Sequence, residues 1–428
     1  MSEFQERVVG FEMEYSPSLR YLDEEGAIVD SIGILVTGYV HRKYLHDDSG
    51  FLENGFRAYT DGVLTEICTP ESHPDQVGIL QLESEKIAMA GVQMVAADES
   101  ISATKDVVAV EPVLPLRVAS EDSVGGFHEN YQCMSDDRDS IANRLEVFAA
   151  SAGVWTGQGF VHKERKGFQT TQKVGRNNRG LADLVELKSD SGEHRYEFRY
   201  MNYPTLHWQL KHRPAYISAL IRALELGVEM PVFGSFNELT VHQSQQTAMA
   251  MSHNPTAPLM NDPEERSAVT FQAELANQLA DVSARFSFPD YEIEAAHQVA
   301  EVLQHMADGN VAKVYKKVPW VIKRIGVRDG WSSIEDIRIK PDDVKRAGDV
   351  CFSFDSLGEG MVLENLRSRD EIYSDDEVAR SVTKRLNRLE VSRRRGESVV
   401  NCQKSRHRKI VNHNWMTDAS FKYDRAIY

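Results

Sequence analysis

The sequence has few cysteines, and their spacing matches no common metal-binding or disulfide pattern. The four are Cys68, Cys133, Cys351 and Cys402, and none belongs to a C-x-x-C pair. Such spacing argues against a zinc knuckle and against the disulfide framework of small secreted domains.

Long apolar runs are also missing. No stretch reaches the ~18 consecutive apolar residues of a membrane-spanning helix, and the opening residues, MSEFQERVV, lack the apolar core of a signal peptide. We therefore expect a cytoplasmic protein without a membrane partner.

The chain has no excess of positive charge. Its formal net charge is -16, which argues against general nucleic-acid binding. Beyond Asp370 the composition becomes basic, and this segment is interpreted either as an RNA-binding element or as a solvated, partner-docking appendage. With 428 residues, 41% hydrophobic and 27% charged, we expect a catalytic domain over 1–370 and a small basic domain over 371–428.

The most informative stretch is NGFRAYTDGVLTEICTPE. As a strand with a period of two, it places Arg57, Tyr59 and Asp61 on one face and apolar residues on the other. Gly62 permits a bend after Asp61. The segment that follows adds Glu66 before a proline ends the pairing.

Two further stretches repeat this alternation. VVGFEMEY sets Glu12 and Glu14 on one face, and RYEFRY sets Arg195, Glu197 and Arg199 on one face, each with aromatic or apolar residues behind. Any single stretch of this kind is typical of a half-solvated strand in an antiparallel sheet. Three of them together indicate a shared polar surface.

That many carboxylates on one surface would repel each other unless cations were bound among them. Mg²⁺ takes oxygen ligands and bridges to substrate phosphates, and arginine guanidinium groups fit phosphate oxygens. The pattern therefore points to nucleotide chemistry.

Helical spacing of apolar residues predicts several other elements. A strand interrupted by prolines is expected over 107–118, and a helix closed by Gly227 over 214–226. Further helical segments are expected over 74–97, 141–152, 264–308 and 310–325.

Taken in order, GFEMEY, NGFRAYTDGVLTEICTPE and HENY resemble the enzymes that handle prokaryotic ubiquitin-like protein, Pup: the Pup ligase and the related Pup deamidase and depupylase. VPWVIKRI and FSFDSLGEGM resemble later segments of that family, so the resemblance extends over about 10–370. It implies an α+β, glutamine-synthetase-like fold, in which a curved antiparallel sheet has helices behind it and a small C-terminal domain follows.

The resemblance also implies roles for individual residues, with ATP and Mg²⁺ as cofactors. Asp61 matches the catalytic carboxylate. The matching metal ligands are Glu12, Tyr59 and Glu66, and Glu14 and Glu129 are further carboxylates that bind the metal or support its ligands. The matching ATP contacts are Arg57, Thr69 and Trp415.

The wider carboxylate-amine ligase superfamily has an R-x-E-x-R strand, which Arg195, Glu197 and Arg199 reproduce. By this match Glu197 is a metal ligand and the two arginines are ATP contacts. The Pup enzymes usually have histidine in the middle position, so the chain resembles a divergent branch.

The reaction implied is ligation. A carboxylate of a Pup-like protein or peptide is activated as an acyl phosphate and joined to a lysine amine of a target protein, whose proton Asp61 accepts. Only residues 16–53 separate the first two motifs, which favours the ligase over the deamidase and its long insertion. The spacing from Asp61 to Glu66, however, is one residue shorter than in the ligase and equals that of the deamidase.

Three other functions stay open: an amide or isopeptide hydrolase of the same fold, a small-molecule glutamate-amine ligase, and a noncatalytic nucleotide-binding protein. Ligation predicts ATP-dependent conjugates, hydrolysis predicts release of conjugates without net ATP consumption, and the noncatalytic protein predicts binding without turnover.

Overall fold

The structure is a computed structural model of the 428-residue chain. It describes residues 6–15, 17–21, 28–31, 33–44, 50–52, 54–62, 64–98, 110–115, 126–162, 167–170, 180–186, 194–199, 203–204, 206–233, 241–259, 262–310, 313–314, 317–321, 324 and 356–357. The domain boundary expected near residue 370, the basic segment after it and Trp415 all lie outside these residues.

The backbone contacts divide the chain into two compact units. Unit 1 consists of Met1–Val9, His73–Asp75 and His128–Phe354. Unit 2 consists of Gly10–Ser72, Gln76–Phe127 and Asp355–Tyr428.

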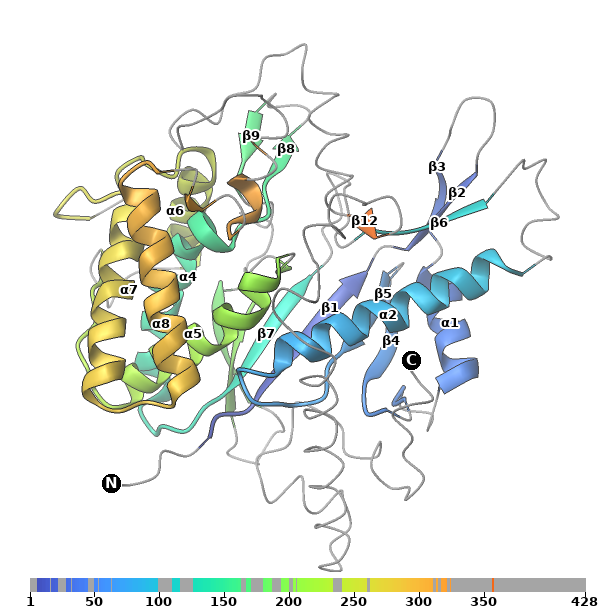
Figure 1. The fold of residues 1–428 in the computed structure, drawn as a ribbon, viewed down its shortest axis with the longest axis horizontal. Helices are drawn as coiled ribbons and strands as arrows, with labels where there is room; N and C mark the ends of the chain where they lie inside the picture. The colour runs from blue at the N-terminus through green and yellow to red at the C-terminus, as the bar shows by residue number, and fades with distance from the viewer. Residues whose placement is uncertain are drawn as a thin grey trace, which may run out of the picture. The chain divides into compact units, whose positions relative to one another are not determined.

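Unit 2 is built on three antiparallel strands in the order β4-β5-β1. Their bounds are β4 Arg57–Asp61, β5 Leu64–Cys68 and β1 Val9–Tyr15. Two helices pack against these strands: α1, Gly33–Tyr44, contacts β4 and β5, and α2, Val77–Ala96, contacts β5 and α1 (Figure 1).

The predicted alternation of β1 is present in the structure. Phe11, Met13 and Tyr15 are buried, while Glu12 and Glu14 are half-buried. Burying each large apolar side chain contributes roughly 1.5–3 kcal/mol, which fixes which face of the strand turns inward.

Helix α2 holds the inward face of β1 in place. The Tyr15 hydroxyl and the Ser84 Oγ are 2.7 Å apart in a buried hydrogen bond. The apolar positions expected of this helix, Val77, Leu80, Ile87 and Val92, are all buried. The helix predicted over 74–97 is therefore confirmed.

A second antiparallel sheet of unit 2 has the order β12-β6-β2-β3. Its strands are β12 Ser356–Leu357, β6 Val110–Pro115, β2 Ser18–Tyr21 and β3 Ile28–Ser31. Strand β6 confirms the strand predicted over 107–118, and α2 packs against it.

Unit 1 contains three antiparallel strands in the order β10-β11-β7, and a small hairpin. The three are β10 Ala182–Glu186, β11 His194–Phe198 and β7 Phe127–Gln132. The hairpin pairs β8 Phe160–His162 with β9 Gly167–Gln169.

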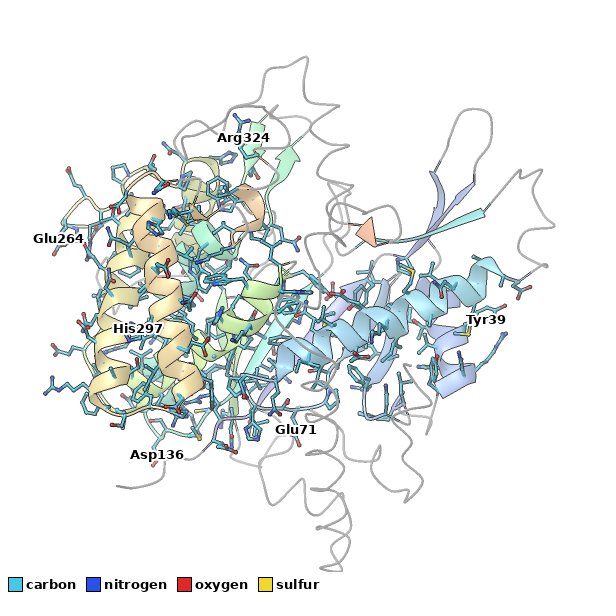
Figure 2. The ribbon with its side chains drawn as sticks, in the orientation of Figure 1. Tyr39, Glu71, Asp136, Glu264, His297 and Arg324 are labelled. Atoms are coloured by element: carbon cyan, nitrogen blue, oxygen red, sulfur yellow. The ribbon has the colours of Figure 1, made fainter. Side chains whose placement is uncertain are left out.

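Five helices of the described part of unit 1 accompany these strands: α4 Arg138–Thr156, α5 His207–Glu225, α6 Val241–His253, α7 Ala268–Arg285 and α8 Asp290–Ala307. Helix α8 packs against α5 and α7, and α4 packs against α6 and β10. On α8, Val299 and Leu303 are buried, whereas His297, labelled in Figure 2, is exposed.

Aromatic rings join the sheet of unit 1 to its helices. Phe198 of β11 packs edge-on against Tyr131 and Phe148, with ring centroids 5.6 and 6.1 Å apart. Trp155 packs in the same way on Tyr216, at 5.5 Å. Each such pair contributes about 0.5–1.5 kcal/mol beyond the area that it buries.

The helix predicted over 214–226 is present but begins earlier, at His207. The prediction took Pro214 as a start signal, whereas this proline lies inside α5. The helix over 141–152 is likewise longer, extending from Arg138 to Thr156. The segment over 264–308 is confirmed as two helices, α7 and α8.

None of the helices in the described part of the chain combines the length and the apolar composition needed to span a membrane.

Candidate active site

The outward face of the three strands in unit 2 groups acidic side chains through strand register. Glu14 pairs with Glu66 between β1 and β5, and Tyr59 pairs with Glu66 between β5 and β4. Glu12 lies opposite Cys68 in the same way. Residues directly opposite in neighbouring antiparallel strands project to the same side, so these side chains share one surface, here called the acidic face.

Asp61 completes the acidic face at the end of β4. One carboxylate oxygen each from Glu14, Asp61 and Glu66 lies within 4.8 Å of the others. Gly62 follows with φ +57°, a left-handed conformation that glycine adopts without strain, so the predicted bend is confirmed. Asp61 itself is exposed and open to a reactant.

Glu66 shows the electrostatic consequence of this grouping. It is 5% exposed, and burial together with the charges of Glu12, Glu14 and Asp61 raises the pKa of its carboxyl to about 8, against a hydrogen bond from Tyr59 that lowers it. An ionised Glu66 is therefore costly at neutral pH unless a cation joins the group.

The acidic face fits a hard divalent cation. Its donors are carboxylate oxygens and a phenol, the ligand type that Mg²⁺ prefers, and three of the oxygens already converge. The raised pKa of Glu66 follows from its burial and from the same neighbouring carboxylates, whose repulsion a bound cation would offset.

Tyr59 belongs to the same group, and its hydroxyl donates a hydrogen bond to Glu66. Burial, followed by the neighbouring Cys68 and Glu66, raises the pKa of this phenol, so it stays a neutral donor. The guanidinium of Arg57 lies 4.7 Å from the Tyr59 ring centroid and 5.5 Å from that of Phe51. Arg57 is thus positioned at the edge of the acidic face.

Glu14 is held by the backbone of Gly126. The Gly126 N–H donates to the Glu14 carboxylate, and the Glu14 N–H donates to the Gly126 carbonyl at 3.0 Å. These two contacts fix both the strand and the side chain of Glu14.

Thr69, expected to contact ATP, joins two strands in the structure. Its side chain is 1% exposed, and its Oγ1 accepts a hydrogen bond from the Phe11 N–H at 2.9 Å. This bond ties the end of β5 to β1, and it turns the hydroxyl away from solvent.

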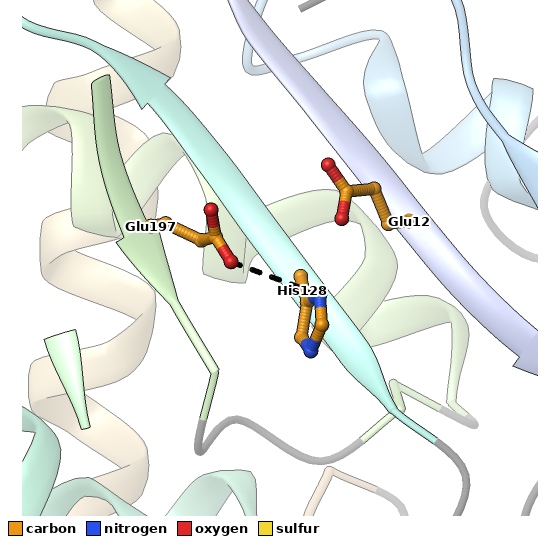
Figure 3. A group of neighbouring side chains, drawn as sticks. All are labelled: Glu12, His128 and Glu197. Carbon is orange, nitrogen blue, oxygen red and sulfur yellow. Dashed lines mark ion pairs between the residues drawn. The ribbon is translucent and has the colours of Figure 1, made fainter. Parts of the chain in front are cut away.

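Unit 1 also has a polar strand face, but its buried carboxylate is paired with arginines. Glu197 is 1% exposed and forms ion pairs with Arg199 at 2.7 Å and Arg195 at 2.8 Å. His128 Nδ1 lies 3.8 Å from the same carboxylate (Figure 3). The predicted alternation is confirmed, because Tyr196 and Phe198 between these residues are buried.

The arginines of unit 1 are held in turn from β10 and α4. Arg199 also pairs with Asp183 at 3.3 Å. Glu146 of α4 accepts hydrogen bonds from the Leu181 and Ala182 N–H groups, both at 2.7 Å, which fixes the start of β10. The start of β10 therefore sets where Asp183, and with it Arg199, lies.

Glu129, expected to be a metal ligand, is placed elsewhere. It is fully buried, pairs with the buried Arg213 of α5, and accepts a hydrogen bond from Tyr131 at 2.7 Å. It therefore faces the helices, and its charge is already neutralised. It is not part of the acidic face.

Two side chains that lie on the polar faces, Cys68 in unit 2 and Asp183 in unit 1, were not predicted from the sequence. Cys68 lies two residues after Glu66 and shares its face, with its Sγ 3.8 Å from the Tyr59 hydroxyl. Burial raises the pKa of its thiol. Asp183 had no signal, since its position depends on the pairing of β10 with β11, although the period of two could have found Cys68.

The fold is that of known ligases. The solved complex between the prokaryotic ubiquitin-like protein Pup and its ligase PafA matches with a TM-score of 0.71 at 18% identity, over 88% of this chain and 80% of that one. The Pup ligase PafA in complex with ADP matches with a TM-score of 0.62 at 16% identity, over 79% and 77%. At these identities the likeness concerns the fold, and the expected α+β architecture is confirmed.

A family model matches the first part of the sequence. Residues 3–180 match the family model described as Pup-ligase protein, and this segment contains the whole acidic face. The predicted resemblance is thereby confirmed over these residues. No curated protein matches the chain.

Proposed function

We propose that the protein is an ATP- and Mg²⁺-dependent ligase that joins a carboxylate of a Pup-like protein or peptide to a lysine amine of a target protein through an isopeptide bond. The observation that carries the proposal is the convergence of Glu14, Asp61 and Glu66 on one strand face, inside the segment that matches the Pup-ligase model.

The acidic face would hold the cation. Glu14 and Glu66 are the first ligands, with Glu12 and the phenol oxygen of Tyr59 beside them. Bound there, Mg²⁺ would neutralise charge on the nucleotide phosphates. Ionised Glu66 then gains the positive neighbour that its burial demands.

Arginines would bind the nucleotide. Arg57 borders the acidic face, and Arg195 and Arg199 of unit 1 are held by Glu197. A guanidinium has five N–H donors, so an arginine that pairs with one carboxylate retains donors for phosphate oxygens. A buried Glu197 between them would serve as a positioning carboxylate for both guanidinium groups.

Asp61 would handle the proton of the incoming amine. A lysine is protonated at neutral pH and must lose a proton before its nitrogen attacks an acyl phosphate. Asp61 is exposed and lies next to the ligands Glu14 and Glu66, so it can meet the amine where the activated carboxylate is held. ATP supplies the phosphoryl group that makes the carboxylate an acyl donor.

The proposal places this reaction in the cytoplasm, with a Pup-like protein as one partner and a lysine-bearing protein as the other. Charge complementarity between the basic C-terminal segment and an acidic tail would support docking.

The test is conjugate formation. The protein is incubated with ATP, Mg²⁺, a Pup-like protein ending in glutamate and a lysine-bearing acceptor, and products are identified by mass spectrometry. Asp61→Asn should abolish conjugates, and the matched variant Asp281→Asn, at an exposed position of α7, should form them at the wild-type rate. Release of preformed conjugates without ATP consumption would establish the hydrolase instead.

A further inference from the structure

Gly126 is a glycine because the side chain of Glu14 occupies the space that a Cβ would need at this position. Its φ is not in the left-handed region, unlike that of Gly62. A Cβ built on Gly126 would lie 2.2 Å from Glu14 Oε1 and 2.8 Å from Glu14 Oε2. The absent methyl group thus leaves the space that the Glu14 carboxylate fills.

The same glycine also holds that carboxylate in place. Its N–H donates to Glu14 Oε2, and the backbone bond from the Glu14 N–H to the Gly126 carbonyl, at 3.0 Å, keeps the two residues in register. The Glu14 carboxylate is therefore held by the Gly126 N–H, and it packs directly against the Gly126 backbone.

We propose that Gly126 is a positioning residue that sets the divalent-cation affinity of the acidic face by holding Glu14 toward Asp61 and Glu66. The inference rests on the proposed function, because it takes the acidic face as the cation site. It assigns to the glycine two residues before the HENY motif a role in metal binding, in place of a role in backbone conformation.

The effect of Gly126 on cation binding can be separated from its effect on folding. The atoms that an alanine methyl would meet belong to the end of a flexible glutamate side chain, which can rotate away at little cost. The fold should therefore tolerate Gly126→Ala, while the Glu14 carboxylate loses its place among the cation ligands. Removing an outer contact of a metal ligand typically lowers metal affinity about 10- to 100-fold.

The matched control is Gly38 in the middle of α1, in the same unit. Nothing lies within 4 Å of a Cβ built there. Gly38→Ala should leave cation binding unchanged, and it should keep or raise the melting temperature, because alanine favours the helix.

The experiment measures binding of Mn²⁺, as a probe for Mg²⁺, by the loss of the free-ion electron paramagnetic resonance signal, without nucleotide. The wild type, Gly126→Ala, Gly38→Ala, Glu14→Gln and the Glu14→Gln, Gly126→Ala double variant are compared, each with its melting temperature. We expect Gly126→Ala to weaken Mn²⁺ binding about 10- to 100-fold with a wild-type melting temperature. In the Glu14→Gln background the same change should have little further effect.

Equal Mn²⁺ affinity of the wild type and Gly126→Ala would overturn the inference, as would a full additional loss in the Glu14→Gln background. A wild type that binds no Mn²⁺ would instead contradict the cation site of the proposed function. Should Gly126→Ala melt early, Gly126→Ser decides by the same measurement, since its larger side chain must displace Glu14 at least as far.

Discussion

In both units, alternation along a strand places polar side chains on one face, but the charge around the buried glutamate differs between the two faces. In unit 2, the buried Glu66 has three carboxylates as its charged neighbours, and its pKa rises to about 8. In unit 1, the buried Glu197 lies between two arginines and beside a histidine. Unit 1 therefore neutralises its buried charge with its own side chains, whereas unit 2 requires a cation from outside.

Replacing Glu66 should have the largest effect on this contrast. Glu66→Gln keeps an acceptor for the Tyr59 hydroxyl but removes the charge that attracts the cation, so conjugate formation should fall roughly 100- to 1,000-fold. The metal-free protein should melt at a higher temperature, because the folded state no longer has to keep a buried carboxyl protonated at neutral pH. Calorimetry with and without Mg²⁺ checks both effects. A variant less stable than the wild type without metal would contradict the electrostatic account.

Replacing an arginine of unit 1 should have a smaller effect. Arg199→Ala loses charge-assisted hydrogen bonds worth about 1.5–3 kcal/mol, so the ATP dissociation constant should rise roughly 10- to 100-fold. Titration with labelled ATP measures it, and Arg285→Ala, an exposed arginine of α7, is the control. Unchanged ATP affinity would assign Arg199 to structure alone.

Replacing Glu146, which fixes the start of β10 near Arg199, should have a smaller effect still. Glu146→Ala leaves the N–H groups of Leu181 and Ala182 without their acceptor, at a cost of roughly 1–3 kcal/mol. The melting temperature should fall by a few degrees, and the ATP affinity should fall with it. Glu146→Gln retains one acceptor oxygen and should recover most of the loss.

A further effect expected is a pH dependence of stability that unit 2 contributes. The pKa of Glu66 is raised from 4.5 to about 8 in the folded state. Between these values the unfolded chain has released a proton that the folded protein still holds, so the free energy of unfolding decreases as pH rises through this window. Saturating Mg²⁺ should make the decrease shallower, since it favours the carboxylate.

Melting temperatures of the wild type and Glu66→Gln across this window measure the contribution. Parallel curves for the two proteins would show that Glu66 does not titrate as its burial implies.

Much of both faces follows from the sequence alone. The alternation of Glu12 and Glu14, of Arg57, Tyr59 and Asp61, and of the R-x-E-x-R residues is a local property with a period of two, and the structure has it. The same rule sets Glu129 and His128 on opposite faces of β7, and the structure has Glu129 paired with Arg213 on the buried side.

Other features depended on distant parts of the chain. The start of α5 was missed because Pro214 is tolerated within a helix when tertiary packing supports it, and Tyr216 just beyond it is fully buried. The contact of Glu146 with the start of β10, and that of Arg213 with Glu129, join residues far apart in sequence. Spacing alone contains no information about such pairs.

The turn between β4 and β5 shows where the chain can change length without harm. Asp61 pairs with Leu64, so Asp61 and Glu66 share a face although five positions, an odd number, separate them. An added residue at the turn would leave both ladders in register, while one inside either strand would send every following carboxylate to the wrong side. The shortened interval between Asp61 and Glu66 is thus a property of the turn, and it does not weigh against ligation.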